Sequence, residues 1–224
     1  ALPISPDFSL TFSMSKSARY RGRDSVHEVL GLGRLVREEL GLGLGGLSLA
    51  DQWALRRASA ATSIVPLAQV GIGVAVKDGT AHPSLATVDD FKRMLQNTRR
   101  VAIINPASGG SSGIYLDGLF QRMGLADDMK AKAVLVNGGL VAEKLISGEA
   151  DVAIHQISEI LPVKGAVLVG PLPEAIQNYT TYAAALHATS PKREMANAFL
   201  QSFSSAQSSV IMRDKGMMAV RTSQ

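Results

Sequence analysis

The sequence predicts an α/β fold with mixed, mostly parallel sheets flanked by helices. Short apolar runs typical of strands alternate with amphipathic segments typical of helices, and the links between them are short. The 224 residues are 46% hydrophobic and 19% charged, so the chain can bury a sizeable core. A chain of this length forms either one large domain or two small lobes.

The predicted strands are short apolar runs bounded by turn residues. They are expected at 8–12, 64–67, 70–76, 101–104, 133–136, 152–154, 167–169 and 181–186. The run at 70–76 is apolar at almost every position, which is typical of a strand buried on both faces. Asp78 and Gly79 mark a turn directly after it.

The predicted helices carry recognisable start and stop signals. They are expected at 88–95, 113–123, 140–146, 191–203 and 205–215. Thr87 and Asp90 have the spacing of a capping box, and Gly216 ends the last helix. Before residue 59, repeated glycines interrupt the helical spacing of Val and Leu, so any helix there is short or frayed.

Composition excludes several classes of function. The chain has no cysteine, which excludes disulfides, thiolate metal sites and a cysteine nucleophile, and its four histidines lack metal-ligand spacing. The net charge of +4 is scattered along the chain, which favours solubility rather than nucleic-acid binding. No apolar run approaches the about 18 to 20 residues that span a bilayer. We therefore expect no cofactor, no nucleic-acid partner and no membrane insertion.

The most informative segment joins the strand at 101–104 to the next helix through a loop of small residues. Small side chains let a ligand approach the backbone, and the first N–H groups of a helix have no internal partner. With the helix dipole these groups form an anion site, to which Ser108, Ser111 and Ser112 add hydroxyl donors ahead of Gly113. The alternative is a plain strand-to-helix turn capped by serine. The lysine of a Walker loop is missing.

Two further segments follow predicted strands at the edge where ligands gather in open α/β sheets. Gly138 lies in a Gly-rich turn at 137–139, which is either a second backbone donor or only a turn. His155 and Gln156 follow the strand at 152–154, and either of them is a candidate to point into a cleft. The alternative for His155 is a structural or surface histidine.

A series of short motifs occurs between about residues 64 and 217. They are the strand at 71–76, Asn105-Pro106-Ala107, and the segments 112–115, 123–127, 148–151, 156–162, 169–173 and 196–216. In this order and spacing they resemble periplasmic molybdate-binding proteins and their relatives, the solute-binding subunits of ABC importers. The segment 156–162, Gln-Ile-Ser-Glu-Ile-Leu-Pro, resembles the branch of this family that includes aconitate isomerase.

The resemblance implies a two-lobed, type 2 periplasmic-binding-protein fold that acts as a monomer. One lobe would comprise residues 1–80 plus 181–224 and the other residues 81–180, joined by hinge strands near 74–82 and 178–186. It also implies an oxyanion held between the lobes by uncharged N–H and O–H donors.

The same resemblance assigns site residues by position. Ser112 falls at a helix-start donor, Gly138 falls near another backbone donor, and Gln156 stands where molybdate binders carry a tyrosine. Ser15 or Ser17 stands in for the serine loop of the first lobe. No counterpart of the second serine loop is visible, and the Gly/Leu/Arg-rich stretch before residue 58 departs from the family pattern.

Three functional readings follow from these residues. The first is a periplasmic solute-binding protein, its leader peptide removed, that presents a small anion to the membrane subunits of an ABC importer. The second is an isomerase of a small tricarboxylate that uses the same cleft, with His155 or Glu159 as the base. The third is a homologue whose first lobe is degraded and which binds no ligand.

Overall fold

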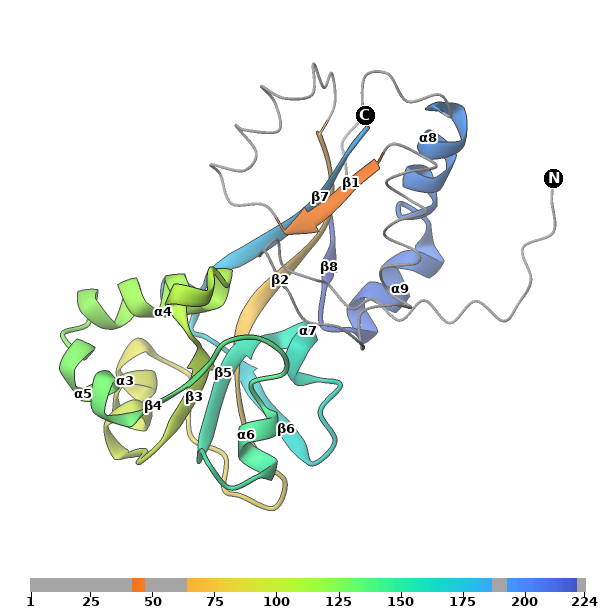
Figure 1. The fold of residues 1–224 in the computed structure, drawn as a ribbon. Helices are drawn as coiled ribbons and strands as arrows, with labels where there is room; N and C mark the ends of the chain where they lie inside the picture. The colour runs from red at the N-terminus through yellow and green to blue at the C-terminus, as the bar shows by residue number, and fades with distance from the viewer. Residues whose placement is uncertain (1–41, 47–63, 187–192, 221–224) are drawn as a thin grey trace.

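The computed structural model describes residues 42–46, 64–186 and 193–220 (Figure 1). The predicted strand at 8–12, the candidate residues Ser15 and Ser17, and most of the Gly/Leu/Arg-rich stretch lie outside these ranges. The strands are β1 (Leu42–Gly46), β2 (Ile64–Lys77), β3 (Val101–Ile104), β4 (Ala133–Val136), β5 (Val152–Gln156), β6 (Ala166–Pro171), β7 (Tyr179–Leu186) and β8 (Met218–Ala219). The helices are α3 (Val88–Asn97), α4 (Ser111–Arg122), α5 (Ala126–Lys132), α6 (Glu143–Ile146), α7 (Ile157–Ile160), α8 (Arg193–Ser202) and α9 (Ala206–Asp214).

Strand β2 is the longest described strand and pairs with four others. Its first half pairs with β7 and β8, and its second half pairs with β5 and β6 (Figure 1). The prediction of two strands at 64–67 and 70–76 was wrong, because β2 continues through both. The register against β7 shifts between Pro66 and Ala68, since a proline cannot donate to the ladder but is tolerated at such an irregularity.

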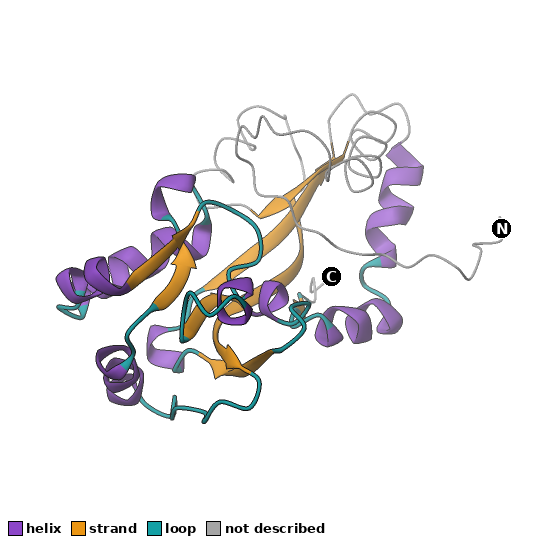
Figure 2. Cartoon of the chain, turned by 60° about the horizontal axis from the view of Figure 1, so that its bottom comes forward, coloured by secondary structure: helices purple, strands orange, loops and turns teal. Residues whose placement is uncertain are grey.

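The predicted mixed α/β architecture is confirmed. Among the described strands, β3 pairs in parallel with β4 and β5, which is the parallel part of the sheet. The pairs that β2 makes, and the pair of β1 with β7, are antiparallel. Figure 2 shows α8 and α9 at one end of the molecule, with most of the other helices around the opposite end.

The second half of β2 is buried on both faces. Val74 and Val76 of β2 pack into one core with Phe91 of α3, while Ala75, between them, packs into a second core with Leu145 of α6. Alternating side chains of a strand point to opposite faces. The near-continuous apolar run predicted for this strand therefore reflects two packed faces.

The change of partners along β2 falls at Gly71 and Ile72. Gly71 is the last residue paired with β7, and Ile72 is the first paired with β5. The chain returns between the two groups of strands through 172–178. The division into lobes 1–80 plus 181–224 and 81–180, with hinge strands near 74–82 and 178–186, stays a prediction. Within the described ranges, no helix is long and apolar enough to cross a membrane.

Several helix boundaries differ from the predicted ones. Helix α4 begins at Ser111, two residues before the expected start. Helix α6 is confined to Glu143–Ile146, because the carbonyls of Leu140 and Val141 accept from N–H groups three residues later, as in a turn, and not four residues later, as in an α-helix. Helix α5 was missed. Its signal was present, since acidic residues open it and lysines close it, as the helix dipole favours.

The capping box of α3 is confirmed and carries a prediction. Thr87 Oγ1 accepts from the Asp90 N–H at 3.1 Å, and the Thr87 N–H donates to Asp90 Oδ2 at 3.2 Å. We expect Thr87→Ala to lower the free energy of unfolding by about 1 kcal/mol in urea denaturation, since the N-terminal N–H of Asp90 loses its acceptor. Thr80→Ala, at an exposed threonine in the turn after β2, is the control. Equal stabilities of the two variants would contradict a capping role.

Candidate functional site

A polar cluster lies where the carboxyl end of β5, the start of α4 and strand β7 meet. Gln156 is the last residue of β5, Ser111 opens α4, and Thr180 is the second residue of β7. Parallel pairing of β3 with β5 brings the loop after β3, and thus Ser111, to the same edge as Gln156. This is the edge at which the sequence predicted a ligand site.

The side-chain amide of Gln156 links the three elements. Its Nε2 donates to Ser111 Oγ at 2.9 Å and to Thr180 Oγ1 at 3.0 Å, and the two hydroxyl oxygens lie 3.3 Å apart. Gln156 is 2% exposed, whereas Ser111 and Thr180 are half-buried. The cluster therefore has a buried centre and an outer end reached by solvent.

Tyr182 closes the buried side of the cluster. Its hydroxyl donates to Gln156 Oε1 at 2.8 Å, and its side chain is buried. Burial, and secondarily the carboxylate of Glu159, raise the pKa of Tyr182 well above its ordinary value. The phenol therefore stays protonated across the physiological range and remains a hydrogen-bond donor to Gln156.

The first turn of α4 presents unused donors beside this cluster. Ile114 is the first residue whose N–H bonds back within the helix, to Gly110 O, and Gly110 provides no side-chain cap. Within the described part of the chain, the N–H groups of 111–113 have no acceptor, and they lie at the positive end of a 12-residue helix. Ser112 Oγ is buried and has no partner among the described residues. A buried, unsatisfied hydroxyl costs about 1 to 3 kcal/mol, and an anion that accepts from it would remove that cost.

Gly113 has a packing role in this arrangement. A Cβ at this position would lie 2.4 Å from the carbonyl oxygen of Ile104, the last residue of β3. Only glycine lets the first turn of α4 pack this closely against the strand end. Its role as a ligand donor stays a prediction for its backbone N–H.

Among the residues that the structure describes, the hydrogen bonds of the Gln156 side chain do not involve Ser108 or Gly138. Ser108 Oγ donates to Asn105 O at 2.7 Å, so its hydroxyl serves the turn before α4. Gly138 is exposed in the turn after β4, next to Asn137, whose Oδ1 accepts from Asn105 Nδ2 at 2.8 Å. The ligand roles of Ser108 and Gly138 stay predictions. Those of Ser15 and Ser17 fall outside the described part of the chain.

His155 precedes Gln156 in β5. It is fully buried, and its Nδ1 is 3.5 Å from Glu159 Oε2 on α7. Gln156, next in the strand, turns toward Ser111 and Thr180 instead. Within the described ranges, no group of three His, Cys, Asp or Glu side chains is placed to hold a metal ion.

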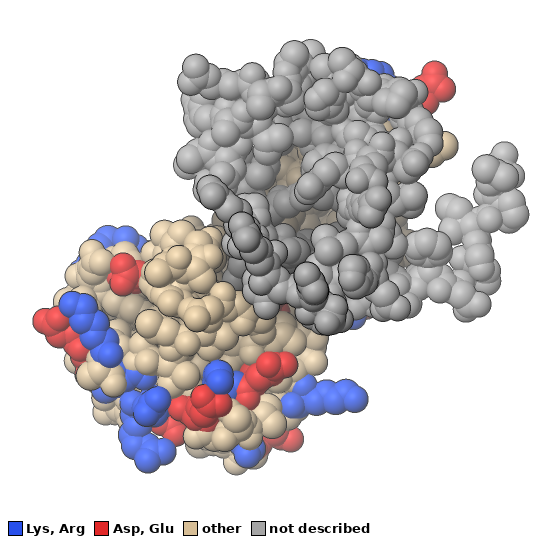
Figure 3. Space-filling model, viewed as in Figure 1, with Lys and Arg blue, Asp and Glu red and all other residues tan. Residues whose placement is uncertain are grey.

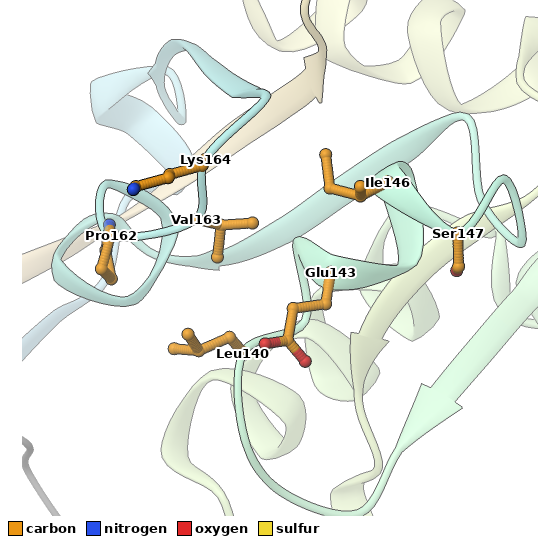
Figure 4. Close-up of a pocket in the computed structure, with 7 residues that line it drawn as sticks. All are labelled: Leu140, Glu143, Ile146, Ser147, Pro162, Val163 and Lys164. Atoms are coloured by element: carbon orange, nitrogen blue, oxygen red, sulfur yellow. The ribbon is translucent and has the colours of Figure 1, made fainter.

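Two surface hollows lie away from this cluster. One, of about 470 Å³, is formed by residues of α6 and of the loop after α7, among them Ile146, Val163 and Lys164 (Figure 4). Another, of about 710 Å³, lies at the opposite edge of the parallel strands and includes Arg93 and Arg99. Each of these arginines already pairs with a carboxylate, Arg93 with Asp90 and Arg99 with Asp151, so their charge is locally offset.

The surface charge does not point to a polyanionic partner on the visible face. Figure 3 shows Lys, Arg, Asp and Glu interspersed over the lower part of the molecule, with no continuous patch of one sign. This agrees with the scattered net charge of +4. It favours a small ligand over a nucleic acid for this face.

Sequence reasoning missed Thr180 and Tyr182. A signal was present, since residues two apart in a strand point to the same face, and both carry hydroxyls. Their relation to Gln156 is long-range, 24 and 26 residues along the chain, and it becomes visible only when β5 and β7 both pair with β2.

Comparison with known proteins places this geometry in context. A family model of bacterial extracellular solute-binding proteins matches residues 47–218. An aconitate isomerase from a Pseudomonas species is 34% identical over 159 residues, which cover 70% of this chain and 59% of that protein. The chain therefore spans less than two thirds of the length of that relative.

Solved structures share the fold at low sequence identity. A substrate-binding domain assigned to a molybdenum ABC transporter from Clostridium difficile is 17% identical, with a TM-score of 0.66 over 85% of this chain and 82% of that one. The periplasmic molybdate-binding protein of Azotobacter vinelandii is 17% identical, with a TM-score of 0.57 over 81% and 78%. The tungstate-binding protein of Desulfovibrio alaskensis is 12% identical, with a TM-score of 0.58 over 85% and 83%.

These neighbours confirm the predicted periplasmic-binding-protein fold, and the family model covers most of the sequence. The resemblance inferred from the short motifs between residues 64 and 217 is confirmed by the same matches. The chain belongs to the bacterial extracellular solute-binding proteins.

Proposed function

We propose that this protein is a periplasmic solute-binding protein that captures a small anion beside Gln156 and delivers it to the membrane subunits of an ABC importer. The ligand would be a molybdate-like oxyanion or a small carboxylate. The supporting neighbours are binding proteins for molybdate and tungstate and a domain assigned to an ABC transporter.

The observation that carries the proposal is the set of unused donors at the start of α4. One helix turn combines N–H groups and a buried Ser112 hydroxyl that have no partner among the described residues with the dipole of a 12-residue helix. Ser111 and Thr180 add half-buried hydroxyls from two other elements. Uncharged donors of this kind hold an anion without requiring a neighbouring cation.

The proposed ligand set keeps the residues that the sequence suggested. Ser111, Ser112 and the N–H of Gly113 would hold one end of the anion, and Gln156 would act through Ser111. Gly138 and Ser108 lie in neighbouring loops at the same strand edge and are proposed as further contacts. Ser15 and Ser17 are proposed as the contribution of the N-terminal part of the chain.

The first test is a calorimetric and thermal-shift titration with molybdate, tungstate, sulfate, phosphate, citrate and the aconitates. A ligand at about 100 times its dissociation constant stabilises the folded protein by about 2.7 kcal/mol. A shift with any of these anions is the expected result. Absence of a shift with all of them would overturn anion capture and favour the homologue with a degraded first lobe.

Ser112→Ala sharpens this test because its two effects have opposite signs. Without ligand the variant should be as stable as the parent or more stable, since an unsatisfied buried hydroxyl is removed. Its affinity for the bound anion should fall about tenfold, which corresponds to about 1.4 kcal/mol. Ser204→Ala, at an exposed position in the turn after α8, should change neither quantity. An unchanged affinity of Ser112→Ala would remove Ser112 from the site.

A second candidate function is isomerisation of a small tricarboxylate. It is favoured by the 34% identity to an aconitate isomerase. Proton abstraction beside a carboxylate needs a base within hydrogen-bond reach. Of the two predicted bases, His155 is fully buried, so the half-buried Glu159 is the one proposed to reach a substrate. Conversion between cis- and trans-aconitate, followed by nuclear magnetic resonance, decides between the two: turnover supports the isomerase, and binding without turnover supports transport.

A further inference from the structure

Tyr182, Gln156, Ser111 and Thr180 form one hydrogen-bonded chain whose direction is fixed at its buried end. An amide oxygen can only accept, and an amide NH₂ group can only donate. Since Gln156 Oε1 receives the Tyr182 hydroxyl at 2.8 Å, the NH₂ group of Gln156 faces the two hydroxyls. It donates to Ser111 Oγ at 2.9 Å and to Thr180 Oγ1 at 3.0 Å.

The outer end of this chain must therefore donate. A hydroxyl has one proton and two lone pairs. Ser111 and Thr180 each use one lone pair for Gln156, and their oxygens are 3.3 Å apart, so one donates to the other. The hydroxyl that accepts twice has no lone pair left, and its proton is free for a third partner. The hydroxyl that donates to it keeps one lone pair.

Burial keeps this direction from being reversed by solvent. Gln156 is 2% exposed and Tyr182 is 7% exposed, so water does not compete for the amide. Ser111 and Thr180 are half-buried, which leaves the free proton at the surface of the cluster. The neighbouring first turn of α4 offers backbone N–H groups and the Ser112 hydroxyl. The groups that face a ligand here are thus predominantly donors.

We propose that Tyr182 is a positioning residue that, through Gln156, makes the Ser111–Thr180 pair a donor, so that the site selects anionic groups that are fully deprotonated. This inference rests on the proposed function and specifies its ligand class. A protonated acid group would bring a donor to a site in which most groups donate, whereas a carboxylate or a metal oxyanion offers acceptors alone.

The test measures the dissociation constants of molybdate and trans-aconitate by calorimetry for the parent, Tyr182→Phe and Gln156→Glu. Tyr182→Phe frees the amide to turn, and we expect affinity to fall about tenfold. Gln156→Glu puts a carboxylate against Ser111 and Thr180, so that both hydroxyls donate inward. We expect affinity at pH 8 to fall about 100-fold. Gln201→Glu, at an exposed position of α8, is the matched control.

The pH profile separates polarity from simple damage to the fold. For trans-aconitate, parent binding should weaken slightly from pH 8 to pH 5.5 as the ligand gains protons. For Gln156→Glu it should strengthen, because protonation of the new carboxyl restores a donor. A merely misfolded variant does not regain affinity in acid.

The outcomes separate the two proposals. If the parent binds either probe while Tyr182→Phe and Gln156→Glu bind it as the parent does, the positioning role is overturned and anion capture stands. If the parent binds neither probe, anion capture of these two classes fails, and the inference fails with it. If Gln156→Glu does not fold, the affinity of Tyr182→Phe decides: a loss supports the inference, and parental affinity overturns it.

Discussion

Gly113→Ala is expected to destabilise the protein by about 3 kcal/mol in urea denaturation, the largest loss that we foresee for one added methyl group. The new Cβ would lie 2.4 Å from Ile104 O and 3.0 Å from the Ile104 carbonyl carbon. Both atoms belong to the backbone of β3, which is buried and paired on both sides, so they cannot move aside cheaply. Helix α4 would have to lift from the strand end.

Gly118→Ala is the matched control within the same helix. At Gly118 a Cβ would approach only Arg122 Nη1, the far end of a flexible side chain, at 3.3 Å. Since alanine favours a helix over glycine by about 1 kcal/mol, this variant should be more stable than the parent. If Gly113→Ala proved as stable as Gly118→Ala, the close packing of α4 on β3 would be wrong.

Gln177→Ala is expected to cost about 2 to 3 kcal/mol of unfolding free energy, measured in the same way. Gln177 Oε1 accepts from the Ile72 N–H at 2.8 Å, and its Nε2 donates to Ile72 O at 2.9 Å. The side-chain amide thus bonds both backbone groups of the residue at which β2 leaves β7 and joins β5. Alanine would leave the buried N–H of Ile72 without its acceptor.

The control for Gln177→Ala is Gln121→Ala on α4. Gln121 also makes a side-chain bond, to Asp117 Oδ2 at 3.0 Å, but this bond is exposed. Loss of an exposed bond should change stability by less than about 0.5 kcal/mol. Equal effects of the two substitutions would mean that water replaces the Gln177 amide at Ile72, and that the crossover of β2 does not depend on it.

Local sequence signals predicted those elements whose structure is decided locally. The strands at 101–104 and 133–136 and the Thr87 cap agree with the structure, because apolar runs between turn residues and a capping box act within a few residues. The continuity of β2 could not be predicted in this way. Pro66 suggests a break in the strand. The strand continues because the residues before and after the register shift at 66–68 both pair with β7.

The candidate site likewise has some features that local sequence predicts and others that depend on tertiary packing. Ser111, Ser112 and Gln156 were predicted from the sequence alone, because small residues before a helix and polar residues after a buried strand mark a binding edge. That Ser112 is buried without a partner, and that Gly113 serves packing, depends on the position of α4 against β3. Neither property is encoded in the loop itself.

The sequence by itself determined the α/β class, the family and the strand edge that carries the donors, since these follow from periodicity, motif order and local turn chemistry. Only the tertiary structure decided that Thr180 and Tyr182 meet Gln156 and set the direction of its hydrogen bonds. The physical reason is that a hydrogen bond needs contact within about 3 Å, which for these residues arises from strand pairing between separate parts of the chain.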